Sequence, residues 1–344
     1  MSVKNAMDRL QLPKPISAGI ILSYKCSSTC KHCMYACSPR WSGDWPTEKN
    51  IELVLRQLAS SIKPSPYGRE KVSLNHGLHF TGGEPFLNFK LLLNAVKTAD
   101  ELRIPSTFAE TNCFWCVNDE QAREKLTALK QAGLKGMLIS VNPFILEQVP
   151  FERTERAINI SKEIFEGNTM IYQETYYHRF KSIRIRNTLT LDKYLEKDKW
   201  ALRYSELLPM GRACYRLKHL FVKYPAKAFF DESCISELTR NWHIHVDNYF
   251  NYMPGYCGGI SLGDARDLDA LTQGVDLQDK PVLRMLVESI GNLYEFAARE
   301  FNYREKEEGY ISKCHLCIDI RRHIVQQTDE YKELRPRELY FNLE

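Results

Sequence analysis

Three cysteines lie close together near the start of the chain, in the segment YKCSSTCKHCMYAC (residues 24–37). Cys26, Cys30 and Cys33 have the spacing C-x3-C-x2-C and directly follow an apolar run. Thiolate is the soft ligand that iron in such clusters prefers, so three thiolates from one loop can hold three corners of a cubic [4Fe–4S] cluster. A set of three leaves the fourth iron without a protein ligand, and an open metal position is where chemistry takes place.

Two other interpretations of this loop are a zinc site and unrelated free thiols. A structural zinc site would need a fourth cysteine or histidine. Cys37 or His32 could supply that ligand. The loop alone favours iron–sulfur over zinc, and a second motif strengthens that interpretation.

The second motif is the sequence TGGEP, residues 81–85, at the end of a predicted strand. The two glycines, Gly82 and Gly83, allow the backbone to approach a ligand closely and leave its N–H and C=O groups available. The following carboxylate, Glu84, suits an ammonium group, because a charge-assisted hydrogen bond is strong and directional. In isolation the motif would be a turn with a surface glutamate.

The two motifs, in this order and on successive strands, resemble the signature of the radical S-adenosylmethionine (SAM) enzymes. The resemblance implies that the open iron binds the amino and carboxylate groups of SAM and passes it an electron. Cleavage then gives methionine and a 5′-deoxyadenosyl radical, which takes a hydrogen atom from the substrate. By the same resemblance, cofactor-binding roles fall to His32, Gly82, Gly83, Glu84, Ser140 and Asn142. The alternative for His32 is a solvated loop histidine. The alternative for Ser140 and Asn142 is capping at the end of a strand.

The composition of the chain is that of an ordinary globular protein. Of its 344 residues, 44% are hydrophobic and 26% are charged, and the net charge of +4 does not indicate nucleic acid. No signal peptide and no run of membrane-spanning length is found, so no membrane is expected. Eleven cysteines in clustered spacings favour metal binding in a reducing compartment over a disulfide scaffold. We expect a cytoplasmic protein.

Strand and helix patterns alternate along residues 18–212 and predict an α/β fold, a partial (β/α)6 barrel of the TIM type. The expected strands are 18–24, 77–86, 106–112, 136–142, 169–177 and 203–209. Expected helices lie between them, with Thr47 and Asn118 as N-caps and Gly133 and Gly167 as stop signals. The sequence motifs fall at the carboxyl ends of the strands, where such folds bind ligands. Residues 1–17 form a lead, and residues 213–344 form a smaller C-terminal domain.

Four cysteines of the C-terminal region have the pattern of one further metal site. Cys234 precedes a predicted hairpin that ends in Cys257, and Cys314 and Cys317 form a C-x2-C that opens a helix. The region resembles the SPASM and Twitch auxiliary-cluster domains of radical SAM enzymes, which implies an auxiliary [4Fe–4S] cluster. It departs from the full SPASM pattern of seven cysteines, so one cluster is expected. A four-cysteine zinc site is the competing interpretation.

Four cysteines and one basic run have no assigned role. Cys37, Cys113, Cys116 and Cys214 fall in loops on the predicted ligand-binding face. They suggest a third cluster or a substrate-directed thiol pair, with separate reduced thiols as the alternative. The run HRFKSIRIR (178–186) could receive an acidic substrate, or form a solvated edge strand.

The expected activity is a SAM-dependent radical oxidation of a peptide or protein side chain, with the auxiliary cluster as electron acceptor. Too few residues precede the first strand for a fused leader-peptide-binding domain. The alternative substrate is a small molecule such as a cofactor or sugar. The resemblance also implies an external electron donor such as flavodoxin or ferredoxin. An alternative of another class is an iron–sulfur electron carrier without SAM chemistry. Substrate-directed catalytic residues are not identifiable from the sequence.

Overall fold

The computed structural model describes residues 8–204 and 206–344, and the chain divides into two compact units. The barrel unit comprises Ile16–Cys30 and Cys37–Leu207. The C-terminal unit comprises the described residues before Ile16, together with Lys31–Ala36 and Leu208–Glu344. The predicted domain boundary at residues 212 and 213 stays a prediction, and part of the predicted lead (residues 1–17) lies outside the described residues.

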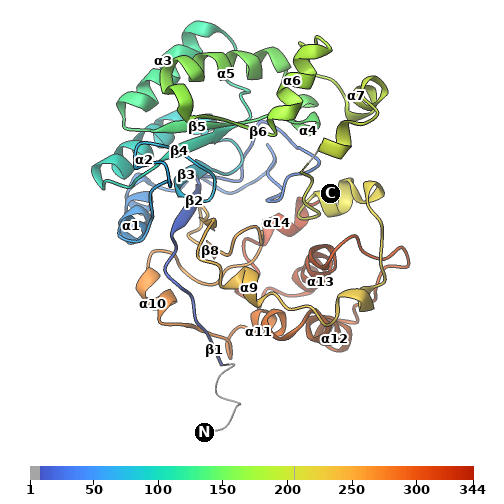
Figure 1. Ribbon diagram of the computed structural model, residues 1–344. Helices are drawn as coiled ribbons and strands as arrows, with labels where there is room; N and C mark the ends of the chain where they lie inside the picture. The colour runs from blue at the N-terminus through green and yellow to red at the C-terminus, as the bar shows by residue number, and fades with distance from the viewer. Residues whose placement is uncertain (1–7, 205) are drawn as a thin grey trace. The chain divides into compact units, whose positions relative to one another are not determined.

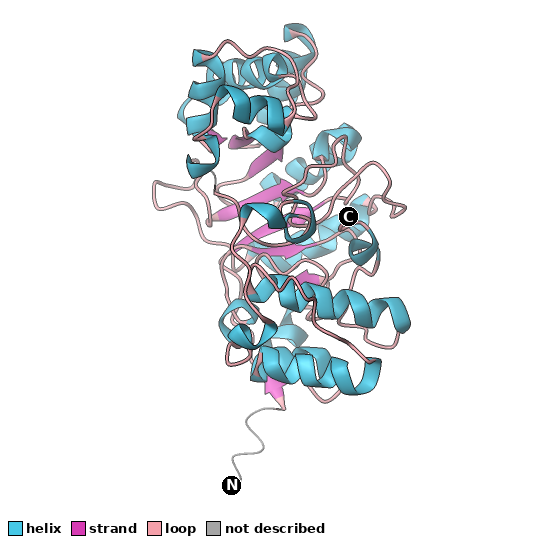
Figure 2. Ribbon diagram, turned by 90° about the vertical axis from the view of Figure 1, so that its right-hand side faces the viewer, coloured by secondary structure: helices cyan, strands magenta, loops and turns pink. Residues whose placement is uncertain are grey.

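A parallel sheet runs through the barrel unit, with strands side by side in the order β6-β5-β4-β3-β2 (Figures 1 and 2). Its strands are β2 (Ser17–Ile21), β3 (Gly77–Thr81), β4 (Phe108–Thr111), β5 (Gly136–Ser140) and β6 (Thr169–Tyr172). All of β2 and β3 is buried, as expected for parallel strands covered on both faces. The predicted α/β class with a parallel sheet is confirmed.

Helices connect these strands and lie along the sheet in Figure 1. The longer ones are α1 (Glu48–Ala59), α2 (Phe89–Glu101), α3 (Asp119–Gln131) and α5 (Phe151–Phe165), and the shorter ones are α4 (Pro143–Leu146), α6 (Glu174–Ser182) and α7 (Leu191–Lys197). The predicted N-caps are confirmed, because Thr47 accepts from the N–H of Asn50 and Asn118 from that of Gln121. Each helix turns apolar side chains inward, which fixes its position on the sheet.

The predicted sixth strand, Arg203–Pro209, is wrong for the residues that the structure describes. Ala201–Tyr204 forms a single 3-10 turn, and residues 206–209 carry no strand; Ser205 lies outside the described residues. The N–H of Arg203 donates to the carbonyl of Trp200 (3.0 Å). This N–H is therefore used within the turn and is not available to a neighbouring strand. Pro209 has no N–H to give to a ladder. A short run of mixed polar and apolar residues such as this one is therefore compatible with a turn.

The fifth predicted strand ends earlier than expected, and the basic run after it is partly helical. Gln173 has a left-handed backbone (φ 64°) that stops β6 at Tyr172. Helix α6 then buries Tyr176, Tyr177 and Phe180, which share one helical face. The edge-strand interpretation of residues 178–186 is wrong, because helical burial of these aromatic side chains outweighs their strand propensity.

The C-terminal unit is built from short strands and helices. Two antiparallel pairs join β7 (Ile244–Val246) to β8 (Tyr252–Met253) and β1 (Arg9–Leu10) to β9 (Val275–Asp276), so the predicted hairpin before Cys257 is confirmed. The helices are α8 (Ala213–Arg216), α9 (Ile235–Leu238), α10 (Leu268–Thr272), α11 (Pro281–Glu288), α12 (Ile290–Phe301), α13 (Lys313–Gln327) and α14 (Glu338–Phe341). In the described part of the chain, every helix is too short or too polar to cross a membrane.

Candidate cofactor site and cysteine cavity

The glycine turn after β3 lies directly against the cysteine loop after β2. The N–H of Gly83 donates to the carbonyl of Ser23 (2.7 Å), and the N–H of Glu84 donates to that of Lys25 (3.1 Å). A Cβ on Gly83 would lie 2.0 Å from the Lys25 oxygen, and one on Gly82 would lie 2.4 Å from the Ser23 oxygen. Only glycine fits this approach, so the two sequence motifs meet through their backbones.

The carboxylate of Glu84 is buried and held in one orientation. Its Oε1 accepts from the Phe86 N–H (3.2 Å) and the Thr111 hydroxyl (3.0 Å), and its Oε2 accepts from the Asn112 N–H (2.8 Å). Burial raises the pKa of Glu84 to about 7, although these hydrogen bonds oppose the rise. A carboxylate has about four lone-pair positions, so this one retains capacity for a further donor such as an ammonium.

The end of β4 also reaches the cysteine loop, through Asn112. Its amide Nδ2 donates to the hydroxyls of Ser27 (3.1 Å) and Ser28 (3.3 Å) and lies 3.6 Å from the Cys26 sulfur. Asn112 and Thr111 are therefore site residues that the sequence analysis did not assign. Their place at a strand end, next to the two motifs, was the available signal.

The base of the cysteine loop is closed by backbone hydrogen bonds. The N–H of Cys26 donates to the carbonyl of Ser38, and the N–H of Ser38 donates to the carbonyl of Tyr24, both at 3.2 Å. The Tyr24 ring stacks on Trp41 with centroids 4.3 Å apart. The loop therefore leaves and re-enters the barrel unit at a fixed pair of points.

The later part of the loop belongs to the C-terminal unit, where it contacts the segment after Leu208. The N–H of Arg212 donates to the carbonyl of Cys33 (3.0 Å), and a Cβ on Gly211 would lie 2.2 Å from the Met34 oxygen. Burial and the nearby Arg212 charge lower the pKa of His32 to about 4. His32 is therefore neutral at physiological pH, and its predicted cofactor role stays a prediction.

Ser140 and Asn142 lie where predicted, at and after the end of β5. Asn142 is buried, and its Oδ1 caps α4 by accepting from the N–H groups of Phe144 (3.1 Å) and Ile145 (2.9 Å). Ser140 is half-buried. The capping function predicted as an alternative for Asn142 is thus present, and binding of SAM by either residue stays a prediction.

Glu110 is a second carboxylate with a raised pKa, next to Glu84 in the barrel unit. Its Oε2 accepts from the Thr81 hydroxyl (2.6 Å), and its Oε1 lies 3.6 Å from Nε2 of His79. Burial raises the pKa of Glu110 to about 7. The folded state therefore binds this proton more tightly than the unfolded state, in which a glutamate titrates near 4.3.

This shift predicts a pH dependence of stability. Because the folded pKa is the higher one, the free energy of unfolding falls as pH rises from about 4.5 to about 7. We expect Glu110→Gln to remove part of that fall and to stabilise the SAM-free protein at pH 8 by about 1 to 2 kcal/mol. Urea unfolding at pH 5 and pH 8 measures it, with exposed Glu124→Gln on α3 as the control. A variant as pH-dependent as the parent would contradict the assignment.

Cys113 and Cys116 are both buried in a turn after β4. The N–H of Cys116 donates to the carbonyl of Cys113 (3.1 Å), and Trp115 between them stacks on Phe86 with centroids 4.2 Å apart. Burial raises the pKa of both thiols, that of Cys116 to about 12. The surroundings favour protonated, separate thiols, and the third-cluster hypothesis stays untested.

The C-terminal unit brings its four candidate ligands to one cavity. Cys234, Cys257, Cys314 and Cys317 all line it, although they come from three separate segments. Cys314 and Cys317 lie in the first turns of α13, as predicted, and Cys234 is the N-cap residue of α9. The sequence pattern thus identified a set of thiols that folding places together.

The thiols of this cavity influence each other. Burial raises the pKa of Cys314 to about 12, and the neighbouring Cys257 and Cys317 add to the rise. Burial likewise raises the pKa of Cys257, to about 11, against the opposing charge of Arg321. Thiolates gathered in this way repel one another, so metal cations bound between them would stabilise the arrangement.

A fifth cysteine, Cys214, lies near this cavity but has a different partner. Its Sγ donates to the carbonyl of Pro209 at 3.2 Å, and the residue is fully buried. Burial, with a smaller contribution from Cys314, raises the pKa of Cys214. This contact gives the Cys214 thiol a partner outside the set of four cavity cysteines, and its part in the third-cluster hypothesis stays untested.

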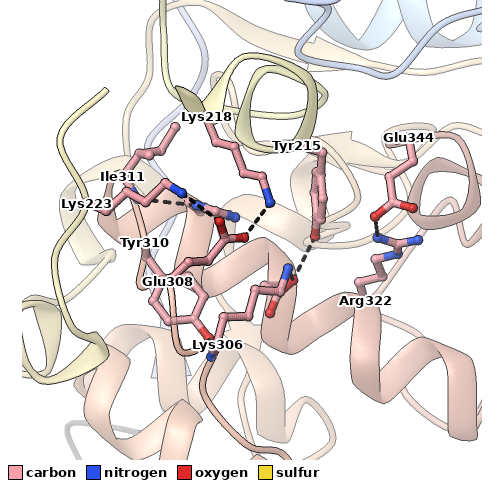
Figure 3. A network of polar contacts seen from close by, with 11 residues as sticks. Tyr215, Lys218, Lys223, Lys306, Glu308, Tyr310, Ile311, Arg322 and Glu344 are labelled. Atoms are coloured by element: carbon pink, nitrogen blue, oxygen red, sulfur yellow. Dashed lines mark hydrogen bonds and ion pairs between the residues drawn. The ribbon is translucent and has the colours of Figure 1, made fainter. Parts of the chain in front are cut away.

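A buried polar network stabilises helix α13, which carries two of the four cysteines. Asp319, two residues after Cys317, accepts from the hydroxyls of Tyr303 (2.8 Å) and Tyr215 (3.2 Å) and from Nζ of Lys306 (2.5 Å). Figure 3 shows this surrounding, in which Glu308 pairs with Lys218 and Lys223, and Arg322 pairs with Glu344. These bonds connect α13 to α8 and to the segment that directly precedes α13.

Loss of the Asp319 carboxylate is expected to destabilise the C-terminal unit. Asp319→Ala leaves two tyrosine hydroxyls and the Lys306 ammonium without their acceptor, which costs about 3 kcal/mol. Urea unfolding at pH 7 measures the change, and metal content per chain should fall with it. Asp329→Ala, at an exposed position after the same helix, is the control. Equal stability of both variants would contradict the importance of the network.

Comparison with known proteins gives likenesses in structure alone. No family model and no curated protein matches the chain. BtrN in complex with AdoMet and 2-DOIA is similar at 13% identity and a TM-score of 0.47, over 83% of this chain and 91% of that one. Native anSMEcpe with bound AdoMet is similar at 13% identity and a TM-score of 0.43, over 96% and 100% of the two chains. SuiB of Streptococcus suis bound to S-adenosylmethionine is similar at 13% identity and a TM-score of 0.32, over 94% and 77%.

Proposed function

We propose that the chain is a radical SAM enzyme with its cofactor site at the carboxyl ends of β2, β3 and β4. The observation that carries the proposal is the backbone contact between the GGEP turn and the cysteine loop. In the proposed site the [4Fe–4S] cluster is held by Cys26, Cys30 and Cys33. When bound, cluster and SAM together supply a 5′-deoxyadenosyl radical that takes a hydrogen atom from the substrate.

The protein's own residues orient SAM in this proposal. Gly82 and Gly83 let the backbone approach the methionine end, and Glu84 receives the ammonium group on its remaining lone pair. The hydroxyl of Thr111 holds the Glu84 carboxylate in place. The amide of Asn112, close to Cys26, holds the cysteine loop in place. Outer contacts to SAM are proposed for His32, Ser140 and Asn142.

We propose further that the cysteine cavity of the C-terminal unit holds an auxiliary [4Fe–4S] cluster. Four thiols that line one cavity are enough for one complete cluster. A four-cysteine zinc site is the competing interpretation, because the ligand set alone does not choose between the two metals. Iron, zinc and sulfide analysis of the purified protein decides between them.

For the substrate we propose a peptide or protein side chain, oxidised with the auxiliary cluster as electron acceptor. The alternative is a small molecule such as a cofactor or sugar. A reducing cytoplasm suits a chain with many cysteines, and the electrons that start each turnover would come from a flavodoxin or ferredoxin.

The test is release of 5′-deoxyadenosine by protein loaded anaerobically with iron and sulfide, then mixed with SAM and dithionite. Each candidate substrate is added in turn, and the one that accelerates release identifies the substrate class. An iron–sulfur electron carrier without SAM chemistry would bind iron but release no 5′-deoxyadenosine under any condition. That outcome would overturn the proposed activity and leave the metal sites standing.

A further inference from the structure

Arg321 is a buried cation on the wall of the cysteine cavity. It lies on α13 one turn after Cys317, on the same face of the helix, and its exposed fraction is 4%. Burial of a charged side chain is costly unless its donors are paired. The partners of this guanidinium therefore decide what it contributes.

Two hydrogen bonds fix one side of the guanidinium. Its Nη1 donates to the carbonyl of Gly258 (3.1 Å) and to the hydroxyl of Tyr340 (2.6 Å). That hydroxyl in turn donates to the carbonyl of Gly259 (2.5 Å). The loop that carries Cys257 and helix α14 together hold Arg321 in a single orientation.

The Nε–H of Arg321 is a buried donor with no hydrogen-bond partner among the described residues. An unsatisfied buried donor costs about 1 to 3 kcal/mol, and more when it is charged. The sulfur atoms of Cys317 and Cys257 lie near enough to act on the guanidinium. Burial by itself would lower the pKa of Arg321, but Tyr340 and these two cysteines raise it. An anionic centre held by the cavity cysteines would satisfy this donor.

We propose that Arg321 raises the reduction potential of the auxiliary cluster by donating its Nε–H to a cluster sulfur. The inference rests on the proposed identity of that cluster. Hydrogen bonds to the sulfurs and the net charge of the surroundings set the potential of an iron–sulfur centre. A fixed positive charge stabilises the reduced form, which carries one more electron. Arg321 thus makes the cluster a better electron acceptor and is not required to bind the iron.

The test compares Arg321→Gln with Arg322→Gln in a parent that lacks Cys26, Cys30 and Cys33, so that one cluster is titrated. Arg322 is the next residue of α13 and pairs instead with Glu344 (2.6 Å). The midpoint potential is measured by EPR during a dithionite titration. We expect Arg321→Gln to make one-electron reduction at least tenfold less favourable, a decrease of about 59 mV. Arg322→Gln should leave the potential unchanged.

Metal analysis distinguishes a failure of the proposed cluster from a failure of the proposed role of Arg321. A parent that holds zinc would overturn both the proposed cluster and the role of Arg321. Iron and sulfide at parental levels with an unchanged potential in Arg321→Gln would overturn the role of Arg321 alone. If Arg321→Gln loses its iron, Arg321→Lys retains the charge without Nε. A midpoint potential of Arg321→Lys that lies below that of the parent by less than about 59 mV would support the inference. An unchanged potential would overturn it.

Discussion

Replacement of Cys30 by alanine is expected to reduce 5′-deoxyadenosine release to the background rate and to remove about four irons per chain. The thiolate set of the cysteine loop has no spare member, because three cysteines are the minimum that holds a cluster with one open iron. The auxiliary site should retain its metal, so the loss is partial. Iron analysis and chromatography of SAM products measure the two effects.

Cys37→Ala is the matched control for this prediction. Cys37 is also a buried cysteine of the same segment, and it is the residue that a four-ligand zinc site would recruit. The radical SAM proposal expects iron content and activity of Cys37→Ala to equal those of the parent. Loss of metal from both variants would instead indicate four protein ligands and contradict an open iron.

Gly83→Ala is expected to decrease SAM cleavage at least about a hundredfold and to destabilise the protein by about 2 to 4 kcal/mol. The new methyl group would lie 2.0 Å from the Lys25 carbonyl oxygen and 2.9 Å from the Cys26 nitrogen. Relief of this overlap requires the turn to leave the cysteine loop, which breaks the hydrogen bond from Gly83 to Ser23. Equilibrium dialysis with SAM and urea unfolding measure binding and stability.

Gly167→Ala controls for the substitution itself. A Cβ at Gly167 meets nothing within 4 Å, and its backbone does not require glycine. This variant should bind and cleave SAM as the parent does. A Gly83→Ala protein with parental SAM affinity would show that the approach of the two backbones is not needed for the cofactor.

The sequence was sufficient to predict the elements that local rules govern. Thr47 and Asn118 cap their helices as predicted, because capping acts over a few residues. For the described residues of 203–209 the predicted strand is wrong, since a short mixed run that ends in a proline can form a turn as well as a strand. The end of β6 was missed because a left-handed Gln173 is not visible in residue type.

The residues of the candidate sites also fall into two groups, those that a local sequence pattern predicted and those that it did not. The cysteine spacings and the GGEP turn are contiguous in the chain, so their residues were predicted by number. Asn112 and Arg321 were not assigned, because their roles depend on which distant segments fold against them. Asn112 reaches a loop that follows β2, and the orientation of Arg321 depends on Tyr340 and Gly258. Such contacts are set by tertiary packing, and the only sequence signal for Asn112 was its place at the end of a predicted strand.

The closed base of the cysteine loop has a consequence for how the protein acquires iron. Because Tyr24, Cys26 and Ser38 are joined by backbone hydrogen bonds, bonds within the chain itself help to bring the ends of the loop together. Metallation should then proceed on the native scaffold, at a rate set by the delivery of iron and sulfide. Circular dichroism of the chelator-treated protein would match that of the loaded form, unlike a zinc finger, which unfolds when its metal is withdrawn.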